Sequence, residues 1–224
     1  MAARKRRSYA RRKATFFEQR WIRVAITVFV VELLILALFS MAPLSSSQQT
    51  SLLSQYSTLE SSITNKSFIY QLLFIAPHNM LIAAIDEIPI LGLAFFGYSI
   101  TQTAMFLNAY AVSINQPGIV LVLALFFLPH TILELPAYAL AVTENLFLSY
   151  ALFKGGFRKE LRRAGVVLGI IIIELLIAGS FESAELQLST YTALLLWIPF
   201  IILISSLLFF LLRRTHTSQK RRVR

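Results

Sequence analysis

The chain has 224 residues, of which 57% are apolar and only 14% are charged, and its net charge is +10. Soluble domains average about 45–50% apolar and about 25% charged residues, so this composition favours a membrane protein and excludes disordered and collagen-like chains. The chain has no cysteine, which excludes disulfides, thiolate nucleophiles and iron–sulfur clusters.

The basic residues fall into three blocks, at 4–23, 154–163 and 213–224. Lys and Arg beside short loops mark the cytoplasmic side of a membrane. We therefore expect a multi-pass protein of the cell membrane with both termini cytoplasmic. In this interpretation residues 1–23 are a basic arm, residues 213–224 are a basic tail, and both attract anionic headgroups. Nucleic acid is a less favoured partner because the arm directly precedes an apolar span.

Between the arm and the tail, residues 24–212 are expected to form a single transmembrane domain. The apolar runs predict an all-α, polytopic transmembrane helical bundle of about six spans. The polar segments 43–66 and 180–189 then lie outside as loops. The six runs are Val24–Ala42, Phe68–Ile85, Ile88–Val112, Gly118–Tyr150, Ala164–Phe181 and Ser189–Leu212.

Two of these runs have open questions of geometry. Phe68–Ile85 either crosses fully or re-enters on the same side. Gly118–Tyr150 is too long for one straight crossing, because 33 residues of helix reach ~50 Å across a core of ~30 Å. Pro129 and Pro136 each lack an N–H and predict breaks in this helix. In the fifth run, Gly165 and Gly169 have the spacing of a helix-packing motif.

No Lys or Arg occurs between Lys66 and Lys154, although this stretch contains several acidic residues and two histidines. Glu32 and Glu174 lie within other spans. Carboxylates inside a bilayer have to be protonated, hydrogen-bonded or loaded with a cation. The candidate structural, proton or ion site therefore consists of His78, Asn79, Asp86, Asn108, His130, Glu134, Pro129 and Pro136.

His130 and Glu134 are four residues apart, which places them on one helical face. They either carry protons, supply two metal ligands, or join Asn79 in a structural network that satisfies carbonyls released by the prolines. The structural interpretation is preferred, because catalytic zinc normally has three protein ligands and the helical His-Glu-x-x-His pattern is absent. We therefore expect no metal, no cofactor and no enzymatic activity.

The run from Phe127 to Ala141 contains Pro-His followed by Glu-Leu-Pro. It resembles the signature of the stage II sporulation protein M family, and Phe74–Asn79 and Phe106–Tyr110 resemble that family's Asn-bearing helices. The resemblance covers residues 68–150. Thr131, Ala109 and the segment 143–145 depart from the family pattern, in which glycines are usual and a small turn is expected at the last position.

The resemblance implies a polytopic membrane protein. In endospore formers one member belongs to an engulfment complex with partners that remodel the cell wall, but relatives occur in organisms that never sporulate. We expect a non-enzymatic scaffold or assembly component whose partners are other membrane proteins or further copies of itself. The alternative is a transporter or channel subunit with a proton or cation pathway through the central carboxylates.

Overall fold

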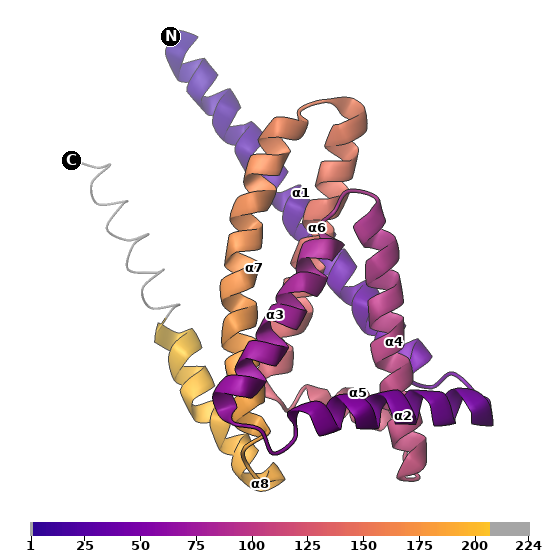
Figure 1. The fold of residues 1–224 in the computed structure, drawn as a ribbon. Coiled ribbons are helices and arrows are strands. Elements are labelled where there is room, and N and C mark those ends of the chain that lie inside the picture. Colours follow the sequence, from indigo (N-terminus) through magenta and orange to yellow (C-terminus); the bar gives the residue numbers. More distant parts are fainter. Residues whose placement is uncertain (1, 207–224) are drawn as a thin grey trace.

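The computed structural model describes the backbone of residues 2–206 and the side chains of residues 19–189 and 192–206 (Figure 1). The described residues contain no strand, which confirms the all-α prediction. The elements are α1 (Ala2–Phe39), α2 (Ser46–Ile63), α3 (Phe68–Asp86), α4 (Leu91–Ser113), α5 (Gly118–Leu125), α6 (Pro129–Lys154), α7 (Phe157–Glu185), α8 (Thr190–Ala193) and a 3-10 turn, η1 (Leu194–Leu196).

Within residues 2–206, three helices are long and apolar enough to cross a membrane: Gln19–Phe39 within α1, then α3 and α7. The count rises to four if α4 and α5, which are bent by 118° relative to each other, form one span. Six spans are therefore not confirmed. α6 is 26 residues long but is not among these candidate spans, and the last apolar helix, Leu194–Ser206, is short. The end of the predicted sixth span and the basic tail 213–224 lie outside the described residues.

The predicted outer loop at 43–66 is mostly helical. Ser45 and Gln48 form a capping box in which each side chain bonds the backbone of the other, so α2 begins directly after Ser45. The ring of Tyr56 lies 5.3 Å from that of Tyr110, between ring centroids, which holds α2 against α4. In Figure 1, α2 and α5 lie across one end of the bundle, opposite the connection between α6 and α7.

The long run Gly118–Tyr150 breaks where one proline predicts it. α5 ends at Leu125, and Pro129 occupies the first turn of α6, where its missing N–H costs nothing. The break predicted at Pro136 is wrong, because this proline lies inside a continuous helix. The segment 143–145 is also helical and buried. Close packing of neighbouring helices around these turns outweighs the one hydrogen bond that Pro136 removes.

Small residues let α6 approach its neighbours. Ala137 and Ala141 are fully buried and pack with Ala83 of α3 and with Ile171 and Leu175 of α7. Ala139, on the other side of α6, packs with residues of α1 and α4. These contacts place α6 at the centre of the bundle, which is visible in Figure 1.

The glycine pair predicted for helix packing contacts no other helix of the described chain. A Cβ atom added at Gly165 or Gly169 would meet nothing within 4 Å, so packing at this pair stays a prediction. Gly179 has this role in the described chain, since its Cβ would lie 2.9 Å from the Cβ of Ala76 on α3. The close contact between α3 and α7 therefore lies about three to four turns nearer the end of α7 than the sequence pattern indicates.

Asn108 fixes the end of α1. Its Nδ2 donates a hydrogen bond of 2.6 Å to the carbonyl of Ala42, just past that helix. Nearby, a Cβ at Gly118 would lie 1.8 Å from the carbonyl oxygen of Ser40, so only glycine fits there. Asn108 was predicted as a member of the polar site, and the structure gives it this structural contact.

A second asparagine, which the sequence did not single out, fixes the turn between α3 and α4. The Nδ2 of Asn145 donates to the carbonyls of Asp86 at 2.8 Å and Ile88 at 2.5 Å. The backbone N–H of Ile90 donates to the Ser149 hydroxyl at 2.9 Å. Ile90 has φ 68°, a left-handed conformation that is costly for a β-branched residue. Side chains of α6 hold this strained turn in place.

Candidate functional site

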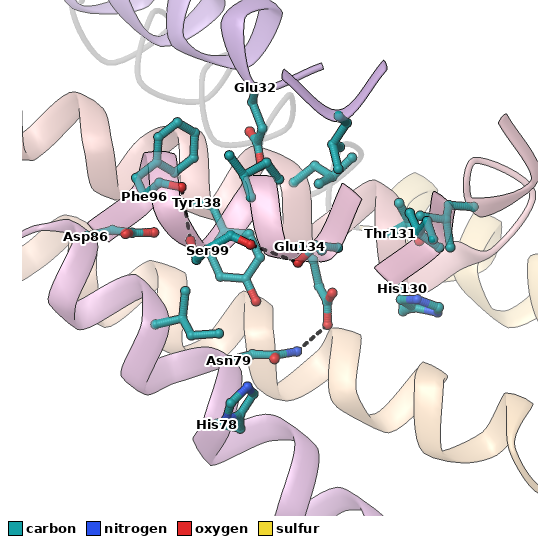
Figure 2. Close-up of a pocket in the computed structure, with 17 residues that line it drawn as sticks. Glu32, His78, Asn79, Asp86, Phe96, Ser99, His130, Thr131, Glu134 and Tyr138 are labelled. Atoms are coloured by element: carbon teal, nitrogen blue, oxygen red, sulfur yellow. Dashed lines mark hydrogen bonds between the residues drawn. The ribbon is translucent and has the colours of Figure 1, made fainter. Parts of the chain in front are cut away.

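A cavity of about 280 Å³ lies between α1, α3, α4, α5 and α6. About half of the residues around it are polar or charged, and these side chains enter it from four helices (Figure 2). Five of the predicted site residues line it, namely His78, Asn79, Asp86, His130 and Glu134. Asn108, Pro129 and Pro136 do not line it. The sequence therefore located the cavity correctly on α3 and α6.

Two carboxylates at this cavity have no partner. Glu32 of α1 and Asp86 of α3 are both 0% exposed, and none of their four carboxylate oxygens has a hydrogen bond. Ionising either group without a counterion is expensive in such a setting. Glu32 was not among the predicted site residues, although an acidic residue in the middle of an apolar span was the signal for it.

Glu134 and His130 lie on one face of α6, as their spacing predicts, but each bonds to a different helix. The Nδ2 of Asn79 donates to Glu134 Oε1 at 2.5 Å, linking α3 to α6, and Figure 2 shows the two side chains pointing at each other. The Nδ1 of His130 is 2.5 Å from Glu185 Oε2, linking α6 to α7. The expected network of His130, Glu134 and Asn79 thus joins three helices.

Glu182 and Glu185 belong to this network, contrary to the prediction that 180–189 is an outer loop. α7 continues to Glu185, so its last turn presents both carboxylates to the start of α6. Ligand atoms of His130, Glu134 and Glu182 all lie within 4.8 Å of one another. In the sequence, the one signal for this role of the two glutamates is their spacing. Ala178, Glu182 and Glu185 are separated by four and three residues, which places them on one face of a helix.

Glu144 has a permanently charged partner, although no Lys or Arg occurs between Lys66 and Lys154 in the sequence. Its side chain is 0% exposed, and Arg163 of α7 approaches it with Nε at 3.0 Å and a terminal nitrogen at 2.9 Å from Oε2. The indole N–H of Trp21 donates to the other oxygen at 2.5 Å. Trp21 therefore contacts a buried ion pair. The cation comes from the basic block at 154–163.

Glu87, in the turn after α3, lies near this ion pair. Burial, and then the negative charge of Glu144, raise the pKa of the Glu87 carboxyl to about 7. One of its oxygens is buried without a partner. A larger share of Glu87 is thus protonated near neutral pH than of an ordinary glutamate, at an end of the bundle where Arg163 is already engaged by Glu144 and by Glu160.

The fold and the site together define a class: an all-helical chain with three or four apolar helices long enough to cross a membrane, and with carboxylates buried between them. The family model described as Stage II sporulation protein M matches residues 24–184. The chain belongs to this family, and the match extends on both sides of the residues 68–150 in which the sequence resembles it. Neither a curated protein nor a solved structure matches the chain.

The ion pair makes a stability prediction. Arg163→Met leaves the carboxylate of Glu144 buried with only Trp21 as a partner, so we expect a loss of ~3–5 kcal/mol of unfolding free energy. The double variant Arg163→Met, Glu144→Gln is expected to recover more than half of that loss. Arg162→Met, at the exposed neighbouring position, is the matched control and stays within ~0.5 kcal/mol. Thermal unfolding in detergent measures all four proteins, and a double variant as unstable as the single one contradicts the assignment.

Proposed function

We propose that the protein is a non-enzymatic membrane component that holds a complex of membrane proteins together. The observation that carries this proposal is that several buried polar side chains, the three buried asparagines among them, fix one helix to another. Asn79 ties α3 to α6, Asn108 ties α4 to the end of α1, and Asn145 ties α6 to the α3–α4 turn. Such contacts make a rigid platform. Membership of the Stage II sporulation protein M family supports the same function.

The surface available to partners is clearest on α1. Only 17% of its apolar window is buried, against 28% for the windows of α3 and α7. Ile26, Val30 and Leu34 follow each other at intervals of four and are 46–58% exposed. This spacing forms one stripe along the helix. In the proposed function the stripe contacts a neighbouring membrane protein or a second copy of the chain.

Because the chain has no cysteine, single cysteines report this contact without background. We expect Ile26→Cys and Leu34→Cys to form cross-links in native membranes, to a partner or to a second copy. Leu36→Cys, at a position 1% exposed on the same helix, is the matched control and stays unlinked. Purification in mild detergent is expected to recover a defined complex or homo-oligomer. A lone monomer, with no cross-link from either stripe position, contradicts the proposal.

The second candidate function is a proton or cation pathway. The cavity favours it, because it brings the carboxyl groups of Glu32 and Asp86 near enough for the charge of Asp86 to act on Glu32. Neither carboxyl group has a hydrogen-bond partner there. Carboxylates in this state exchange protons or bind cations readily if water enters. The proposal needs a connection from the cavity to both sides of the membrane, which a change in helix packing has to provide.

Flux measurements separate this candidate from the scaffold. If protons or cations move through the cavity, vesicles containing the protein show a pH- or cation-gradient-driven flux. Asp86→Asn is then expected to lower the flux at least ~10-fold, as loss of a positioned proton-transfer group does. Glu174→Gln, on α7 and outside the cavity lining, is the control that retains it. Flux equal to that of protein-free vesicles eliminates this candidate.

A further inference from the structure

Three side chains able to bind a metal converge where the start of α6 meets the end of α7. His130 and Glu134 extend from one face of α6, and Glu182 extends from α7. One ligand atom of each lies within 4.8 Å of the others. In an occupied zinc site, donor atoms 2.0–2.1 Å from the ion are about 3.4 Å apart. Closing from the observed spacing needs side-chain movements of about 1 Å and no change in the helices.

His130 is already oriented as a ligand. Glu185 engages its Nδ1 at 2.5 Å, which places a proton on Nδ1, so that the neutral ring has its lone pair on Nε2. A carboxylate behind the histidine is the usual arrangement at zinc sites, because it fixes the ring and increases its basicity. Asn79 similarly holds Oε1 of Glu134 and leaves Oε2 for a ligand bond. Both residues thus have supporting contacts beyond the three candidate ligands.

Among the described side chains, the cluster brings three carboxyl groups together with one basic group, His130. Glu134, Glu182 and Glu185 meet here, and among the described ion pairs the one that reaches them joins Glu185 to His130. The Glu185 side chain is 8% exposed, yet its Oε1 is buried without a hydrogen bond. This orphaned oxygen is independent of the three ligands, and a cation or a water bound to that cation would satisfy it.

We propose that His130, Glu134 and Glu182 bind a divalent transition-metal ion of the Zn²⁺ type, with Glu185 orienting His130. One imidazole nitrogen and two carboxylate oxygens suit Zn²⁺ or Mn²⁺, and three protein ligands leave a position for water. Mg²⁺ and Ca²⁺ require about six or more oxygens and fit poorly. The ion cross-links α6 to α7. It also lies at the wall of the cavity, which His130 and Glu134 line.

The test uses the full chain in detergent, without a histidine tag, after treatment with a chelator. The protein is incubated with Zn²⁺, Mn²⁺ or Mg²⁺ alone and desalted, and its metal content is measured. We expect one equivalent of Zn²⁺ to be retained and no Mg²⁺. Glu182→Gln is expected to weaken Zn²⁺ binding at least 10-fold in a titration. Glu174→Gln, on the same helix and outside the cluster, binds as the unchanged protein does.

Zn²⁺ also provides a readout that separates binding from folding. The thermal midpoint of the unchanged protein is expected to rise when Zn²⁺ is added. The midpoint of Glu182→Gln with Zn²⁺ is expected to equal the midpoint of the same variant without metal. Protein that retains no Zn²⁺ after desalting overturns the proposal, as does equal binding by Glu182→Gln. Neither result affects the assembly proposal, which is read from cross-links and not from metal content.

Discussion

From Thr131 to Leu148, α6 is enclosed by α1, α3, α4 and α7, so the polar side chains of this stretch have to find their partners inside the protein. Ala137 and Ala139 point to nearly opposite sides of the helix, since two residues turn it by about 200°, and both are at most 2% exposed. The remaining contacts follow from this enclosure. Glu134, Glu144 and Asn145 each bond to a different neighbouring element, and together they set the places of α3, α7 and the α3–α4 turn.

The two ends of α6 meet different electrostatic conditions. Toward the connection with α7, Glu144 is neutralised by Arg163 and further bound by Trp21. At the opposite end, Glu134 lies near two carboxylates of α7, and His130 is the basic group that meets them. Buried charges of one sign are stable only when protonated or matched by a cation. A cation bound near His130 would therefore stabilise this end of α6.

The sequence predicted the helical class, the family and the α3 and α6 residues around the cavity, because apolar periodicity and isolated polar residues are local signals. It failed where the partner is distant in the chain. Arg163 reaches Glu144 from the next helix, and Glu182 and Glu185 reach His130 from the end of α7. The spacing of Gly165 and Gly169 did not locate the contact between α7 and α3, because spacing alone does not identify the helix face that meets a neighbour. Gly179 makes that contact. Asn145 was missed because the turn that it holds is almost 60 residues away.

The enclosure of α6 is the central claim, and enlarging alanines on its two sides tests it most directly. Ala137→Leu and Ala139→Leu each insert three carbons into packed interior, so each should lower the unfolding free energy by ~1–3 kcal/mol. Ala94→Leu, at an exposed position of α4, is the matched control and should change it little. Thermal unfolding in detergent measures the three variants. If either α6 variant is as stable as the control, that side of α6 is open, and the account of an enclosed central helix is contradicted.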